Sequence, residues 1–471
     1  MKLVRNYLYN AGYQILLLIT PLLTVPYISR VLGPTGVGIN ATTNSVITYF
    51  LLLGTLGVTI YGNREIAGCR EDIHKRSVKF WEIEIMQIST ILVAYCVFLI
   101  WLYFTTQFKM YFFLQSFLIL AGAFDISWYF MGLEDFKKTV LRNVIVKIIS
   151  LLCIFTLVKD SQDTGIYILI LSLSQILGNI TLWPYLRTSV KTVRLGELHI
   201  WSHFRPSVAL FIPQIAIQIY VALNRTMLWK LDSVTASGYY DYADKLIKLV
   251  LALVTATGII MLPRISNLFA HGETKKIHRY LYASFDFVSC IAFPLAFGVA
   301  ATATSLAPWF FGAQFSSVSS LLIIESPIIL FIGWSNVIGQ QYLIPTRQVK
   351  QYTQSVTIGA ITNIVLNIPL IIIWGVRGAA IATLVSELVV TLYQLFVVRK
   401  QLTMWKLFRN FSKYLIAGIL MFVVVYCLNI QMKIGVGSIA GQVLEGGLIY
   451  AGLLLILQPS LITDVKYILK H

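Results

Sequence analysis

The sequence predicts an all-α polytopic membrane protein with about 14 transmembrane helices. Apolar residues make up 57% of the 471 residues and charged residues only 12%, and the mean hydropathy is +0.77. This composition excludes a soluble globular protein. The apolar residues form long runs separated by charges or by Gly and Pro turns, and about 20 such residues cross a bilayer as a helix. The runs leave no room for a separate soluble domain, so the function must lie in the spans.

The first apolar run, within residues 2–29, begins with basic residues, as a signal peptide does. It is longer than a signal peptide, lacks an A-x-A cleavage site and continues directly into further runs. We therefore interpret it as the first span. The complete set of predicted spans is 7–31, 37–62, 80–105, 110–132, 143–159, 165–186, 206–231, 238–263, 281–307, 318–345, 353–374, 377–398, 414–429 and 441–462.

Lysine and arginine residues are distributed unevenly over the connections between these spans. If the N-terminus lies in the cytoplasm, 27 of the 37 basic residues fall in or beside cytoplasmic segments, six fall in external segments and four lie within spans. Because cytoplasmic loops are enriched in Lys and Arg, we predict that both termini are cytoplasmic. This topology accounts for the net charge of +17, and we expect no nucleic acid as a partner.

A weak internal repeat relates the two halves of the chain. A displacement of 200 residues aligns 14–91 with 214–291 and gives 15 identities in 78 positions, against roughly six expected from composition. The displacement spans six predicted helices, which preserves orientation and places a binding site at the interface of the repeats. We therefore predict an N-terminal lobe at 1–200, a C-terminal lobe at 201–400, and two further spans with a cytoplasmic C-terminus at 401–471.

Sequence motifs for nucleotide or metal chemistry are missing or weak. The sequence contains neither an ATP-binding GxxxxGK[ST] loop nor an HExxH or DxD pattern, and its five cysteines have no CxxC spacing. His199 and His203 have the i, i+4 spacing that could share a metal. The segment 187–205 around them instead reads as a basic amphipathic helix on the inner membrane surface. We interpret GPTGVG at 33–38 as a tight external turn between the first two spans.

Basic residues inside the spans are candidates for binding cargo, because a charge at the bilayer centre costs at least about 2.5 kcal/mol unless it faces protein or water. Arg225 lies in the seventh predicted span, and Lys245 and Lys248 lie in the eighth. One interpretation pairs the two lysines with Asp241 and Asp244, four residues earlier on the same helix face.

The other interpretation joins these cations into a basic wall where the two repeats meet. A cationic cavity in a membrane implies an anionic cargo, and Arg binds phosphate in a bidentate manner. The predicted substrate-binding residues are Arg225, Arg30, Lys245, Lys248 and Lys230.

Acidic residues inside the spans point to a different ligand. Glu387 lies in the middle of the twelfth span, and Glu325 lies in the outer half of the tenth. A carboxylate at this depth is protonated, paired or bound to a cation. We therefore expect these two residues to bind a coupling ion, Na⁺ or H⁺, and we expect no cofactor and no resident metal. Asp125 and Asp286, near the cytoplasmic ends of their spans, are interpreted as structural.

Three stretches of the sequence resemble one family. These are PYISRVLGPTGVGINATTNSVITYFLLLGTLGVTIYGNREIA at 26–67, FDISWYFMGLEDFKKTVLRN at 124–143, and TMLWKLDSVTASGYYDYADKLIK with MLPRISNLF at 226–248 and 261–269. They look like the Wzx-type bacterial polysaccharide repeat-unit flippases of the superfamily that includes multidrug exporters and the lipid II flippase. The sequence of these stretches is most similar to that of the streptococcal-type capsule or exopolysaccharide members of this family. The resemblance covers nearly the whole chain.

The resemblance implies two pseudo-symmetric six-helix lobes around a central cavity, followed by two C-terminal helices. It also implies transport of an undecaprenyl-pyrophosphate-linked oligosaccharide across the bacterial cytoplasmic membrane by alternating access. The implied partners are this lipid-linked oligosaccharide, membrane lipids, and the polymerase and glycosyltransferases of the same pathway. In the seventh span the family often has a basic residue at the position of Arg225.

Two other functions remain open from the sequence. A multidrug or metabolite cation antiporter of the same fold would favour acidic cavity walls over the basic ones predicted here. A membrane polysaccharide polymerase or glycosyltransferase would be expected to have a large external loop or an acidic metal motif, and every predicted external connection is short. The sequence does not identify the sugar, because ordinary polar side chains bind glycans.

Overall fold

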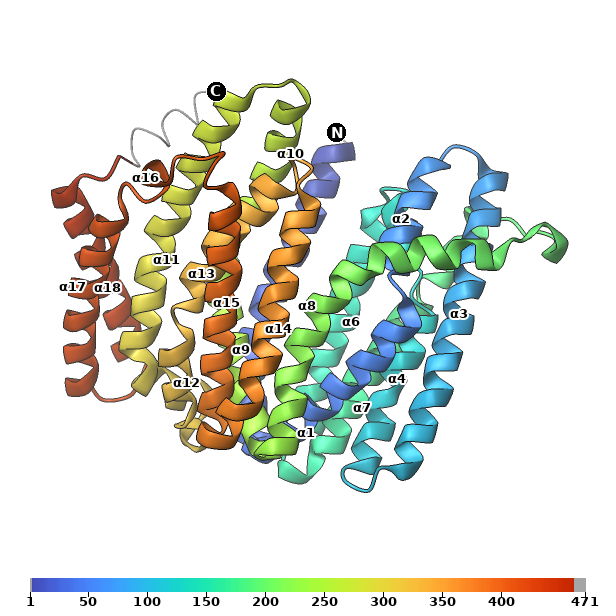
Figure 1. Cartoon of the computed structure of the whole chain (residues 1–471). Coiled ribbons are helices and arrows are strands. Elements are labelled where there is room, and N and C mark those ends of the chain that lie inside the picture. The colour runs from blue at the N-terminus through green and yellow to red at the C-terminus, as the bar shows by residue number, and fades with distance from the viewer. Residues whose placement is uncertain (1, 461–471) are drawn as a thin grey trace. The chain divides into compact units, whose positions relative to one another are not determined.

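The computed structural model describes residues 2–460, and every regular element in this range is helical (Figure 1). The all-helical membrane fold predicted from composition is confirmed. The α-helices are α1 Lys2–Thr55, α2 Val58–Gly68, α3 Ile73–Phe104, α4 Lys109–Ala123, α5 Ser127–Gly132, α6 Phe136–Leu157, α7 Thr164–Ile180, α8 Phe204–Leu231, α9 Val234–Thr255, α10 Thr257–Ala270, α11 Thr274–Phe311, α12 Val318–Glu325, α13 Ile328–Ser335, α14 Val349–Trp374, α15 Val376–Val398, α16 Met404–Leu407, α17 Phe411–Gln431 and α18 Val436–Leu457.

Eleven helical stretches within the described residues are long and apolar enough to cross a membrane. The first of them, Ile19–Gly68, contains the second predicted span and residues 19–31 of the first. The seventh and eighth predicted spans correspond to α8 and to α9 with α10, which lie outside these eleven. Each of the fourteen predicted spans therefore has a helical counterpart in the structure.

Gly33 divides α1 into two helical segments. Its backbone has φ 65° and ψ −179°, a conformation that is almost restricted to glycine. Pro34 follows, and its fixed φ suits the first position of the second segment. Figure 1 shows α1, in blue, changing direction between its two segments. The turn predicted at GPTGVG is therefore a kink at one glycine rather than a loop.

The described chain forms two compact units, which divide between Trp229 and Lys230. The first unit contains a core of aromatic side chains where α2, α3 and α5 meet. Phe80 stacks on Trp128 with ring centroids 5.6 Å apart. Gly62 allows this packing, because a Cβ atom at that position would lie 2.5 Å from the Trp128 ring.

The amphipathic surface helix predicted for 187–205 is wrong. The segment consists of short 3₁₀ turns at Trp183–Thr188, Leu195–Glu197 and Ile200–His203, with extended residues between them. Two of its backbone N–H groups bond to α3 instead: the Lys191 N–H donates to the Ser77 hydroxyl at 2.9 Å, and the His199 N–H donates to Glu82 at 2.7 Å. A helix would need these donors for its own ladder.

Glu82 also holds the end of this segment through a buried polar cluster. The His203 ring contacts the Glu82 carboxylate at 2.7 Å through Nε2 and the Tyr61 hydroxyl at 2.6 Å through Nδ1. Lys79 pairs with Glu82 at 3.1 Å. The residues that looked like a metal-binding histidine pair therefore have different roles, because His203 is buried in this cluster and the His199 side chain is exposed.

In the second compact unit, α11 packs against α12, α13, α17 and α18. Asp286 on α11 accepts two hydrogen bonds of 3.0 Å from the Asn410 amide and one of 3.0 Å from the Tyr414 hydroxyl. This agrees with the structural role predicted for Asp286. The two helices outside the sequence repeat, α17 and α18, are therefore part of the second unit's core.

The compact units and the sequence repeat have different boundaries. The first unit includes α8 as far as Trp229, whereas the repeat begins its second half near residue 201. The division of the chain into lobes at 1–200, 201–400 and 401–471 stays a prediction.

Candidate functional site

Arg225 lies on α8 among polar groups contributed by the second segment of α1. The hydroxyl of the next residue, Thr226, is 2.9 Å from the Ser45 hydroxyl and 3.1 Å from the Tyr49 hydroxyl. Arg225 is partly buried and lies close enough to Tyr49 for its charge to act on that hydroxyl. A guanidinium whose charge reaches the Tyr49 hydroxyl is suited to bind an anionic oxygen.

Arg30 and Lys230 have more exposed surroundings. Arg30 Nη1 donates to the Pro26 carbonyl of its own helix at 2.7 Å. Lys230 is exposed in the last turn of α8. Their roles in substrate binding stay predictions.

Lys245 and Lys248 form ion pairs along one face of α9. Lys245 Nζ is 2.6 Å from Asp241, and Lys248 Nζ is 2.8 Å from Asp244. The structure therefore shows the helix-face pairs that the spacing allowed. Side-chain exposures of 41% and 46% leave both ammonium groups accessible. The roles of Lys245 and Lys248 in substrate binding, and the basic wall that would join them to Arg225 and Arg30, stay predictions.

The two predicted ion-binding carboxylates both lie in the second compact unit. Glu325, at the end of α12, is buried, and its Oε1 has no hydrogen-bond partner among the described residues. The Asp244 and Lys248 charges act on it. Glu387 on α15 is partly buried, and its charge acts on the Tyr352 hydroxyl. The surroundings of both carboxylates are compatible with a bound cation or a proton.

The structure adds an apolar cavity that sequence reasoning missed, which we call the aromatic groove. It has a volume of about 900 Å³ and lies among α11, α12, α13, α15 and α17. Its lining includes Phe293, Phe297, Phe331, Trp334, Phe408 and Phe422, together with the cation Arg409. Five of these six aromatic residues lie in three of the predicted spans, and Phe408 lies in the connection before the thirteenth span. Nothing in the sequence pattern distinguishes them from the other residues of these segments. A cavity of this size and lining suits a hydrocarbon chain.

Two family models match this chain, and curated relatives match it over most of its length. A family model described as polysaccharide biosynthesis protein matches residues 3–269, and one described as lipid II flippase MurJ matches residues 140–444. Proteins named "Putative O-antigen transporter" from Shigella dysenteriae and Escherichia coli K12 are each 24% identical to this chain. The alignments cover 80% and 85% of this chain and 96% and 97% of the relatives.

Solved structures show the same fold. The inward closed conformation of the lipid II flippase MurJ has a TM-score of 0.74 at 17% identity and covers 98% of this chain and 100% of that structure. An inward-facing multidrug transporter of the MATE family has a TM-score of 0.57 at 11% identity, with 83% of this chain and 99% of that structure covered. Because both family models cover more than half of the 471 residues, and the relatives are transporters and flippases rather than enzymes, the chain belongs to the polysaccharide biosynthesis family of membrane flippases.

Proposed function

We propose that this protein moves an undecaprenyl-pyrophosphate-linked oligosaccharide repeat unit from the inner to the outer leaflet of the bacterial cytoplasmic membrane. Glycosyltransferases would build the unit before it is moved. A polymerase would then use the translocated unit for capsule or exopolysaccharide synthesis. The observation that carries this proposal is the alignment with O-antigen transporters over 96–97% of their length.

Two described features, each within its own compact unit, suit parts of such a cargo. The aromatic groove offers apolar surface for a polyprenyl chain, and Arg225 with its neighbouring hydroxyls offers donors for a pyrophosphate. A glycan needs only ordinary polar side chains. Alternating access would expose these surfaces to each leaflet in turn.

The membrane potential favours this direction of transport. The pyrophosphate carries about two negative charges, and each charge that crosses 100 mV gains about 2.3 kcal/mol, so an inside-negative potential assists outward movement by roughly 4–5 kcal/mol. Inward movement of Na⁺ or H⁺ through Glu387 and Glu325 would add to this driving force.

Removal of the protein tests the proposed function in cells. Synthesis of the repeat unit should continue while translocation stops, so lipid-linked oligosaccharide should accumulate on the cytoplasmic leaflet, protected from an external glycosidase in intact spheroplasts. The loss should be toxic because the carrier lipid is trapped. Deletion of the first sugar-phosphate transferase of the pathway should relieve the toxicity.

Two outcomes of this experiment would contradict the proposal. Single units that reach the outer face but stay unlinked would indicate a polymerase. Increased drug sensitivity without any accumulation would indicate an exporter, a function supported by the MATE-like fold alone.

A further inference from the structure

Glu84, on α3, is a completely buried acidic residue that none of the predicted sites includes. Its exposure is 0%, and neither Oε1 nor Oε2 has a hydrogen-bond partner among the described residues. Its neighbours Ile83 and Met86 belong to the core of the first compact unit. A carboxylate in this place has neither water nor a protein donor to stabilise its charge.

The charges near Glu84 do not pair with it. A carboxyl group at this depth in a membrane is protonated, paired or bound to a cation. The one charge that acts on Glu84 from the described residues is that of Asp125, in the turn between α4 and α5, and it is negative. Other ionisable groups on the elements packed against this part of α3 contact each other or Glu82: Arg64, Glu65 and Tyr61 on α2, Lys79 on α3, and His203. An ionised Glu84 would therefore be buried without an opposite charge among the described residues.

Gln87 places a further acceptor on the same side of α3, because it lies three residues after Glu84. Its Nε2 donates to the carbonyls of Gly122 and Asp125 at 2.6 and 3.2 Å. These bonds fix the amide group, and its Oε1 is buried with no donor among the described residues. A protonated carboxyl group supplies one O–H donor and keeps an acceptor, whereas an ionised one supplies acceptors alone. A proton on Glu84 therefore provides the donor that Gln87 Oε1 lacks.

We propose that Glu84 is a proton-binding site of the first compact unit, in which the neutral carboxyl group donates its O–H to the Gln87 amide oxygen. The proton comes from water and adds to one carboxylate oxygen, so the side chain changes from a charge of −1 to neutral. This site is separate from Glu325 and Glu387, which lie in the second unit and are predicted to bind a coupling ion.

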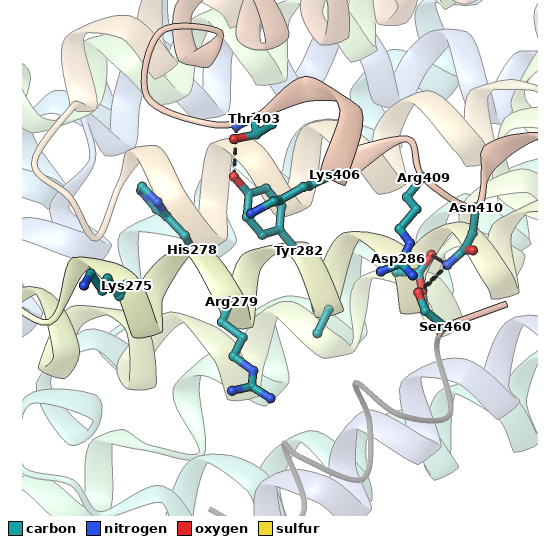
Figure 2. A pocket seen from close by; sticks show the side chains of 11 residues that line it. Lys275, His278, Arg279, Tyr282, Asp286, Thr403, Lys406, Arg409, Asn410 and Ser460 are labelled. Atoms are coloured by element: carbon teal, nitrogen blue, oxygen red, sulfur yellow. Dashed lines mark hydrogen bonds between the residues drawn. The ribbon is translucent and has the colours of Figure 1, made fainter.

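Asp286 in the second unit shows the surroundings that Glu84 lacks. Asp286 is also buried in an apolar helix, but it accepts hydrogen bonds from the Asn410 amide and the Tyr414 hydroxyl, and Figure 2 shows the amide beside it. The burial of a carboxyl group in this fold can thus be accompanied by donors, and at Glu84 it is not.

The sequence repeat provides a second comparison. The displacement of 200 residues aligns Glu84 with Ser284, which is also buried. The Ser284 hydroxyl donates to the Gln341 amide oxygen at 2.6 Å. At the related position the second unit therefore has an O–H group that donates to a glutamine, which is the contact proposed for Glu84.

Infrared spectroscopy of the purified full-length chain in nanodiscs tests for the proton directly, because a neutral carboxyl group absorbs at a higher frequency than a carboxylate. At pH 7 the unaltered chain should have a neutral carboxyl band that E84Q lacks. The control E71Q removes an exposed carboxylate from the turn between α2 and α3 and should keep this band. The same band intensity in E84Q as in the unaltered chain overturns the proposal.

Reversible unfolding in mixed detergents between pH 5 and pH 8 provides a second measurement. The unfolded chain releases this proton at neutral pH while the folded chain keeps it, so folding of the unaltered chain takes up a proton and weakens by up to about 10-fold per pH unit. Glutamine needs no proton. The stability of E84Q relative to the unaltered chain should therefore rise with pH, and E71Q should follow the unaltered chain.

Two results of the unfolding experiment overturn the proposal. An E84Q protein that fails to fold, or is less stable than the unaltered chain at pH 8, would mean that the site needs a negative charge. Stabilisation of the unaltered chain by Na⁺ that E84Q loses would mean that the site binds sodium. Because neither measurement involves transport, failure here is distinguishable from failure of the proposed function.

Discussion

Lys245 and Lys248 each pair with an aspartate one turn earlier on α9, whereas His203 finds its carboxylate 121 residues away on α3. The first kind of contact could be predicted from sequence, because an i, i+4 spacing fixes which side chains meet on a helix. The second could not be predicted, because it depends on how the connection between α7 and α8 folds against α3. The spacing of His199 and His203 was misleading, since no α-helix contains both residues.

Removal of His203 should destabilise the protein while removal of His199 should not. H203A leaves the buried Glu82 carboxylate with one donor fewer, which typically costs about 1–3 kcal/mol. H199A keeps the backbone N–H that binds Glu82. Thermal unfolding of the purified chain in detergent should show a lower midpoint for H203A only. Equal midpoints would mean that the cluster adds nothing to stability.

Arg225 is predicted to contact the pyrophosphate. Loss of one charge-assisted contact costs about 1.5–3 kcal/mol, or roughly 10- to 150-fold in affinity. R225A should abolish polymer export, and R225K should restore part of it because the charge is kept without the bidentate geometry. Export is measured alongside the amount of protein in the membrane. Normal export by R225A at a normal protein level would remove Arg225 from the site.

Glu387 is predicted to bind the coupling ion. E387Q removes the charge at nearly constant volume, so flipping in liposomes should lose its dependence on a sodium or proton gradient. E445Q, on the exposed face of α18, provides the matched control and should keep that dependence. Full gradient dependence in E387Q would assign Glu387 a structural role.

At the scale of the element, Gly33 sets the course of α1. The run GPTGVG was sufficient to predict a change of direction, because glycine followed by proline interrupts a helix. The sequence could not show that Gly33 alone changes the direction of α1 while the chain stays helical on both sides of it. The aromatic groove was equally hidden, because apolar periodicity marks helices without showing which of them leave a space between their side chains.

Substitution of Gly33 should be costly while substitution of Gly68 should be tolerated. G33A places a Cβ in a backbone conformation that costs about 1–3 kcal/mol for a non-glycine residue. Gly68, at the end of α2, has open space around the position of a Cβ and no positive φ. Comparison of the unfolding midpoints and membrane levels of G33A and G68A tests this difference. A G33A protein as stable as G68A would mean that the kink can relax.

At the scale of the whole molecule, the membrane fold follows from composition, but its orientation depends on the basic residues in the connections. The 27-to-6 asymmetry predicts cytoplasmic termini. Single cysteines placed at 162 and 313 in a cysteine-free background should react with an impermeant reagent from outside, and those at 72 and 273 should not. The reverse labelling pattern would invert the topology.

The helix α8 begins the second half of the sequence repeat and yet belongs to the first compact unit. The Ser207 hydroxyl donates to the Leu56 carbonyl at 2.8 Å, and Thr226 lies against Ser45. If the chain were expressed as two fragments divided near residue 200, α8 would therefore lie on the second fragment. Its partners Leu56 and Ser45 would lie on the first. A division between α8 and α9, at residues 232–233, would keep each unit whole. A cut that follows the repeat therefore separates residues that fold together, whereas a cut that follows the compact units separates residues that are related in sequence.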